Sequence, residues 1–283
     1  MNEILDNILL GIIYLFSSFI LFFIGKFVYQ MFHRNINVKD ELVEQDNFAF
    51  AVAHTGYFIA LLFVIGSAII GESLGIIEDL INIFSYGMLG ILLLNLSIII
   101  NDKFILHKFN VRKEIIEDRN AGTGVVEGAS AISTGLIIFG SIYGEGDAFI
   151  SALVFWLIGQ ILLIITAKIY NLITPYDIHF HIEKDNVAVG IGFAGALISV
   201  ANLIRFALMP DFESWTFSLM NIGIDFTIAL VFLPIARLLA DKILLPGQRL
   251  TDELINQETP NHGAAIIEAF SYIAVSVLIT WCL

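Results

Sequence analysis

Two glutamates at matching places in two apolar stretches are the residues best suited to chemistry in this sequence. Glu127 lies about one turn inside the stretch 123–143, and Glu268 holds the equivalent place in the stretch 264–283. An ionisable side chain within a bilayer costs roughly 2.5–3.5 kcal/mol on insertion scales, so its presence needs a reason. One reason is proton or cation handling by a pair of carboxylates. The other is a first-turn glutamate that the helix dipole stabilises and a loop Lys or Arg neutralises. The sequence leaves both open.

Two opposite charges form a second candidate pair. Arg205 and Asp225 lie in the outer portions of the stretches 187–209 and 217–239. Adjacent antiparallel helices could bring them together, so we expect an intramembrane ion pair whose favoured role is to lock two helices.

Three polar residues within other apolar stretches have a structural and a functional interpretation. His54 is expected to pack between helices rather than relay protons. Asn95 and Gln160 are expected to form hydrogen bonds between helices rather than bind a solute. His54 and Asn95 nevertheless join the two glutamates as candidate transport or proton-handling residues.

Two motif-like strings do not support a cofactor or metal site. Gly190-Ile-Gly192-Phe-Ala-Gly195 spells G-x-G-x-x-G, but it lies inside an apolar span and lacks the preceding strand of a nucleotide fold. Asp177-Ile-His179-Phe-His181 could offer two imidazoles to a metal if extended, but no further ligand is evident. We therefore predict no cofactor and no metal.

Catalysis and nucleic-acid binding also find no support. The sequence contains no Ser-His-Asp arrangement, phosphate loop or zinc-protease motif, so we do not expect an enzyme. The loops mix acidic with basic residues and form no continuous basic surface, so nucleic acid is not an expected partner.

The elements that must position these residues are membrane-spanning helices. The chain of 283 residues is 58% hydrophobic and only 14% charged, well below the charged fraction of soluble domains. About 20 apolar residues cross a bilayer as a helix, and lipid cannot satisfy open strand edges. Eight stretches qualify: 8–31, 48–70, 81–101, 123–143, 148–170, 187–209, 217–239 and 264–283. Glycines concentrate in and just before the fourth stretch, 123–143, so we expect this helix at the centre of the helices that it packs with.

The distribution of basic residues orients these spans. All of the 14 Lys and Arg residues except Arg205 fall in, or next to, the four longer loops, whereas loops 71–80, 144–147 and 210–216 carry acids instead. The positive-inside rule places the longer loops in the cytoplasm and both termini outside it. We expect a multi-pass membrane protein with both termini outside the cytoplasm.

The chain also repeats itself. Asn47–Gly56 matches Asn186–Gly195, Asp102-Lys103 matches Asp241-Lys242, and the two glutamates correspond as well. These landmarks keep their order and nearly constant spacing, which argues against chance. The sequence predicts an all-α integral membrane protein with two tandem parallel four-helix repeats, 1–146 and 147–283.

Two segments resemble a known family. They are Asn101–Glu127, which includes Arg112-Lys-Glu-Ile-Ile-Glu-Asp-Arg-Asn, and Thr174-Pro-Tyr-Asp-Ile followed by Glu183-Lys-Asp-Asn-Val-Ala. The chain resembles the bacterial inner-membrane proteins of domain of unknown function 350 (the YjfL-type, UPF0719 proteins), here as a tandem of two four-helix units. The resemblance implies location and architecture rather than chemistry. The second unit departs from the pattern where Pro234 replaces Asn95.

Two functions remain open. The first is a channel or secondary transporter for a small ion or solute, which the parallel repeat and the charged residues within spans favour. The second is a non-transporting scaffold or envelope-stress component, whose loops 102–122 and 240–262 dock a cytoplasmic peripheral partner through a short amphipathic helix. The expected partners are the lipid bilayer and, left open, a second copy of the chain or that peripheral protein.

Overall fold

The fold is helical throughout the part of the chain that the structure, a computed structural model, describes: residues 2–71, 73–143, 149–210, 212–245 and 247–283. Eight of these helices are long and apolar enough to cross a membrane, which confirms the eight predicted spans. The predicted boundary between 146 and 147 lies outside the described residues. The long helices are α1 (Asn2–Phe32), α2 (Phe48–Ile69), α3 (Ile76–Phe104), α5 (Ala121–Tyr143), α6 (Phe149–Ile173), α8 (Val187–Leu208), α9 (Trp215–Leu239) and α11 (His262–Cys282).

Helix α3 begins earlier than the hydropathy pattern predicts. It starts at Ile76 rather than 81, so Glu78 and Asp79 lie in its first turn instead of in a loop. Acidic side chains are stabilised there because the helix dipole is positive at its N-terminus. Asp79 also accepts hydrogen bonds from the Leu74 amide at 2.9 Å and the Ser73 hydroxyl at 2.6 Å.

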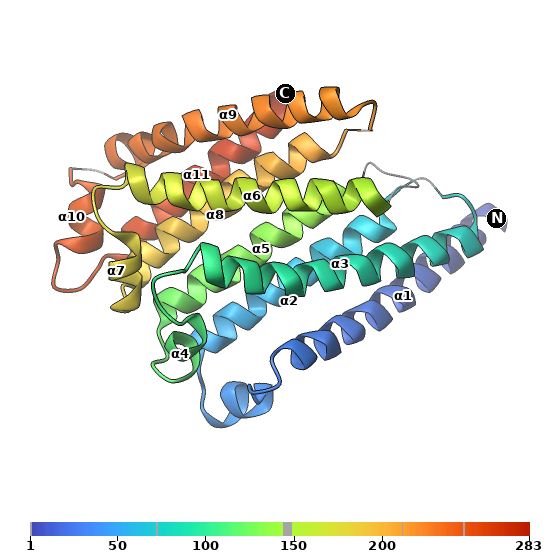
Figure 1. The fold of residues 1–283 in the computed structure, drawn as a ribbon, viewed down its shortest axis with the longest axis horizontal. Helices are drawn as coiled ribbons and strands as arrows, with labels where there is room; N and C mark the ends of the chain where they lie inside the picture. Colours follow the sequence, from blue (N-terminus) through green and yellow to red (C-terminus); the bar gives the residue numbers. More distant parts are fainter. Residues whose placement is uncertain (1, 72, 144–148, 211, 246) are drawn as a thin grey trace.

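The long helices form two layers. One layer is a row in which α5 packs between α2 and α8, and α8 packs between α5 and α11. The other layer runs in the order α1, α3, α6 and α9 against the first (Figure 1). Each repeat supplies two helices to each layer, and the α5–α8 contact joins the repeats. Helix α5 therefore lies at the centre of the molecule, in line with its glycine content.

Glycines allow α5 to approach its neighbours closely. A Cβ atom added at Gly135 would lie 2.6 Å from the Cα of Ala60 in α2, well inside van der Waals contact. At Gly56, such an atom would overlap the backbone of Gly128 on the facing helix. Close backbone packing of this kind holds membrane helices together where the hydrophobic effect cannot.

Three short helices collect at the end of the bundle opposite the N-terminus (Figure 1). They are α4 (Val111–Ile116), α7 (Ile178–Glu183) and α10 (Leu250–Ile255). Two single π-helical turns, Asp40–Glu44 and Ala240–Leu244, complete the connections that carry the basic residues.

Asparagine caps fix these connections in the same way in both repeats. Asn47 and Asn186 are the N-caps of α2 and α8, and each Oδ1 accepts a hydrogen bond from the amide three residues later, at 3.1 and 3.0 Å. Each Nδ2 then donates to a backbone carbonyl of the following short helix, Ile115 or Leu254, at 2.9 Å in both cases. The asparagine that opens each copy of the repeat motif therefore caps one helix and ties it to another.

Removal of one such cap should be measurable. We expect Asn186→Ala to lower the free energy of unfolding by about 1–2 kcal/mol, because α8 loses its cap and the Leu254 carbonyl loses its donor. Thermal unfolding in detergent, followed by circular dichroism, measures this. Asn256→Ala is the matched control, since Asn256 is exposed and bonds only within its own turn, to Asp252. Equal stability of the two variants would contradict the assignment.

Candidate functional site

Two carboxyl groups face each other in the first repeat. Glu127 in α5 lies beside Asp102, in the last turn of α3, with the two side chains within hydrogen-bonding reach. Among the described residues, no Lys, Arg or His lies within ion-pair distance of either carboxyl group. A hydrogen bond between two carboxyl groups requires one of them to carry a proton. The arrangement is therefore able to hold a proton or a small cation.

Aromatic side chains of α1 and α2 pack beside this pair of carboxyl groups. Tyr29 of α1 lies near both carboxyl groups and packs against His54 and Tyr57 of α2, with ring centroids 4.7 and 4.6 Å away. His54 is 3% exposed and stacks on Phe50, and its Nδ1 has no hydrogen-bond partner among the described residues. His54 thus packs between helices α1 and α2, as expected, with its ring against that of Tyr29.

Asn95 links three helices. Its Nδ2 donates to the Tyr57 hydroxyl at 3.2 Å, and that hydroxyl donates to the Gly25 carbonyl of α1 at 2.8 Å. This chain of hydrogen bonds across α3, α2 and α1 agrees with the interhelical role predicted for Asn95.

The matching glutamate of the second repeat has a different environment. Glu268 is fully buried, and its Oε1 accepts hydrogen bonds from the hydroxyls of Tyr170 at 3.2 Å and Tyr272 at 3.0 Å. Arg237 of α9 forms an ion pair with the same oxygen at 2.5 Å. Glu268 is thus neutralised by a basic residue, which is one of the two roles that the sequence leaves open for these glutamates. Glu127 instead has a second acid, Asp102, as its neighbour.

Single substitutions between the repeats account for this divergence. Arg237 aligns with Ile98 of the first repeat, so at this position the first repeat has no arginine that could pair with Glu127. Asp241, which aligns with Asp102, accepts a hydrogen bond from the Leu250 amide at 2.6 Å, beside Lys242 at 3.3 Å. The carboxyl pair is therefore particular to the first repeat. The charge pattern groups Arg237 with the basic loops, so it does not predict a role for this residue inside the bundle.

The expected ion pair between Arg205 and Asp225 does not form. Arg205 donates to the Asn202 side chain at 3.3 and 3.2 Å, and its guanidinium lies 5.8 Å from the ring centre of Phe139 in α5. The ion pairs found among the described residues do not include Asp225. The prediction was wrong because Arg205 turns towards α5 rather than towards α9.

Gln160 also differs from expectation. It is 1% exposed, and neither side-chain atom has a hydrogen-bond partner within the described part of the chain. The polar link of α6 to α3 is made instead by the Trp156 indole, which donates to the Ser97 hydroxyl at 2.8 Å.

The D-x-H-x-H string is helical rather than extended. Asp177 caps α7, and an ion pair with Lys108 at 2.5 Å lowers the pKa of its carboxyl group. His179 is buried against Ile105, and loss of solvation lowers its pKa, while His181 lies on another face. The described residues contain no group of three metal-ligating side chains.

The G-x-G-x-x-G string lies within helix α8, as its apolar context predicts. A Cβ atom at Gly190 would lie 2.7 Å from the Gly122 carbonyl oxygen, and one at Gly192 would overlap the carboxylate of Glu268. These glycines therefore serve helix packing and make room for the buried ion pair.

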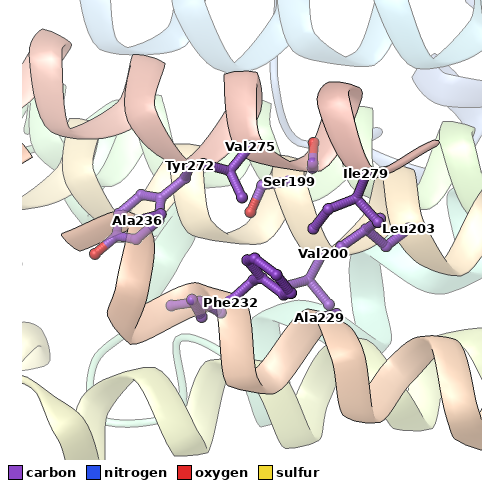
Figure 2. Close-up of a pocket in the computed structure, with 11 residues that line it drawn as sticks. Ser199, Val200, Leu203, Ala229, Phe232, Ala236, Tyr272, Val275 and Ile279 are labelled. Carbon is purple, nitrogen blue, oxygen red and sulfur yellow. The ribbon is translucent and has the colours of Figure 1, made fainter. Parts of the chain in front are cut away.

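Four cavities among the described residues bear on access to the two glutamates. None of the four described cavities is lined by Glu127 or Glu268. Figure 2 shows the one between α8, α9 and α11, where Val200, Phe232 and Ile279 close the space. Its volume is about 10 Å³, hardly enough for one water molecule. The largest, about 410 Å³, is an open apolar groove on α2, α5 and α8.

The comparisons with known proteins agree with the repeat and the spans. The model of the family described as Domain of Unknown Function (DUF350) matches residues 3–142 and again 145–283. A "UPF0719 transmembrane protein" of Aquifex aeolicus (strain VF5) is 26% identical over 257 residues, which are 88% of this chain and 91% of the relative. No solved structure matches the chain at a significant level. The chain is a multi-pass transmembrane protein, and with two copies of the domain along nearly its whole length it belongs to the DUF350 family.

Proposed function

We propose that the protein moves a small ion, most simply a proton, across the membrane, and that Asp102 and Glu127 form its binding site. The carboxyl pair carries this proposal, because two acids in contact and without a basic partner gain most from a bound proton or cation. Ionisable groups in this position are costly to keep unless they serve a pathway or a partner.

The side chains around Glu268 and around Glu127 support a different role for each repeat. The Arg237–Glu268 pair is compensated internally and acts as a fixed anchor between α9 and α11. The Asp102–Glu127 pair of the first repeat has no basic partner among the described residues. It can therefore bind and release a proton or a small cation. Tyr29 of α1 lies beside the pair and packs against His54 of α2.

The charge asymmetry and the family resemblance support a location for the protein. We place it in the bacterial inner membrane, with the short helices α4, α7 and α10 in the cytoplasm and both termini on the opposite side. The carboxyl pair then lies near the cytoplasmic ends of α3 and α5.

The docking alternative has less support. Of the apolar residues expected to form an amphipathic surface helix, Ile105, Leu106 and Ile115 are buried at 1%, 1% and 6% exposure, whereas Ile116 is half-buried and Phe104 is 51% exposed. Loss of a co-purified partner on loop deletion, with the fold intact, would favour this function instead.

A liposome assay tests the transport proposal. We expect the wild-type chain to dissipate a pH gradient, measured with an enclosed pH-sensitive dye. Asp102→Asn and Glu127→Gln should each slow this flux on the order of a hundredfold, as expected when a proton-transferring group is lost. Asp225→Asn is the matched control, because it also neutralises an acid in a span, and it should retain the flux. Unchanged flux in both site variants, or no flux in the wild type, would overturn the proposal.

A further inference from the structure

A cavity of about 130 Å³ lies at the junction of the two repeats, and neither Asp102 nor Glu127 lines it. Phe104, Ile105 and His107 line it from the end of α3, and Ala167, Lys168 and Asn171 line it from the last turns of α6. His179 of α7 closes it. It is thus built by the first repeat on one side and by the second repeat on the other.

His179 supplies a buried polar atom without a partner. The side chain is 4% exposed, and its Nε2 donates to the Ile105 carbonyl at 2.7 Å. Since a carbonyl only accepts, the hydrogen lies on Nε2, and the neutral ring presents a lone pair at Nδ1. Nδ1 has no hydrogen-bond partner among the described residues, although the Asp177 carboxylate, which is paired with Lys108, has its Oδ1 3.9 Å away. An unpaired buried nitrogen is costly unless a ligand or water supplies the missing bond.

The cavity carries positive charge that the protein leaves uncompensated. Lys108, at its edge, is paired with Asp177. Lys168 is exposed, and the ion pairs found among the described residues do not include it. Lys168 and the exposed imidazole of His107 therefore offer hydrogen-bond donors to an anion.

The depth of the cavity indicates what kind of anion would enter. Lys168 lies five residues before Ile173, where α6 ends, and Phe104 is the last residue of α3. Both positions lie at the ends of candidate membrane spans, where the acyl chains of a bilayer would meet its headgroups. Basic pockets between spanning helices at this depth suit phospholipid headgroups, and the apolar walls of Phe104 and Ala167 suit the first carbons of an acyl chain.

We propose that this cavity binds the headgroup of an anionic membrane phospholipid that carries a free hydroxyl. Lys168 and His107 hold the phosphate, and His179 Nδ1 accepts a hydrogen bond from the headgroup hydroxyl. The bound lipid would bridge α3 of the first repeat to α6 and α7 of the second. It would thus stabilise the repeat junction at the end of the bundle that carries the basic loops.

Lipid binding to the purified full-length chain tests this inference. The probes are phosphatidylglycerol, zwitterionic phosphatidylcholine and inorganic phosphate, each titrated into the detergent-solubilised protein, with thermal unfolding and native mass spectrometry as readouts. We expect phosphatidylglycerol alone to raise the melting temperature and to remain bound. Lys168→Gln should weaken this binding about fivefold, which corresponds to about 1 kcal/mol for one lysine at an anionic headgroup.

Two further variants separate the site from general charge and from misfolding. Lys184→Gln removes an exposed lysine of the same end of the bundle, outside the cavity, and should bind as the wild type does. His179→Gln keeps a donor for the Ile105 carbonyl and removes Nδ1, so it should bind more weakly while remaining folded. Equal binding of both lipids, an equal effect of inorganic phosphate, or equal losses in Lys168→Gln and Lys184→Gln would each overturn the proposal.

Discussion

Replacement of Arg237 by Leu is expected to lower the free energy of unfolding by about 3–5 kcal/mol, because it leaves Glu268 as an unpaired charge in the interior. The arginine side chain is 14% exposed and the glutamate side chain is 0% exposed, so water cannot substitute for the lost partner. The hydroxyls of Tyr170 and Tyr272 offer hydrogen bonds but no charge. Thermal unfolding of the purified protein in detergent measures the loss.

The reverse change should be milder. In Glu268→Gln, the amide oxygen still accepts from the tyrosine hydroxyls, and the arginine lies closer to solvent. The double variant Arg237→Leu with Glu268→Leu should recover most of the stability, since replacement of a buried ion pair by apolar residues is often nearly neutral. Arg205→Leu is the matched control, because Arg205 has no carboxylate partner among the described residues. If Arg237→Leu melts at the wild-type temperature, the ion pair is not formed.

Gly56→Val is expected to cost more than about 3 kcal/mol, at or above the upper end for overpacked cores. The added side chain would overlap the backbone of Gly128 on α5, and a backbone cannot rotate away as a flexible side chain can. Helices α2 and α5 would have to separate along their whole contact. Size-exclusion chromatography and thermal unfolding in detergent should both report this.

The same substitution at Gly223 provides the control. Gly223 lies within α9, and a Cβ atom added there meets nothing within 4 Å. We expect Gly223→Val to change stability by no more than about 0.5 kcal/mol, which is typical of surface positions. Similar losses at the two glycines would contradict close helix packing as the source of the cost.

Much of the fold could be predicted from the sequence because hydropathy acts locally. Each span needs about 20 apolar residues whatever its neighbours are, so all eight helices were predicted within a few residues. The early start of α3 was missed because hydropathy takes no account of the favourable placement of Glu78 and Asp79 at a helix N-terminus.

Side-chain pairing could not be predicted in the same way, because it depends on which faces of two helices meet. Arg205 and Asp225 were expected to pair from their depth alone, yet Arg205 turns towards Phe139 of α5. Asn95 behaved as expected because an amide in a span finds a partner on almost any neighbouring helix, here Tyr57.

The eight spans, the two repeats and the unusual glutamates Glu127 and Glu268 could all be predicted from the order of residues along the chain. The difference between the two glutamates could not, because it depends on packing: one faces Asp102 and the other faces Arg237. The physical reason is that hydrophobicity depends on each residue separately, whereas the state of a buried carboxyl group depends on the few side chains within about 4–6 Å of it. Those side chains come from helices far apart in the chain, and their positions are set by how the helices pack.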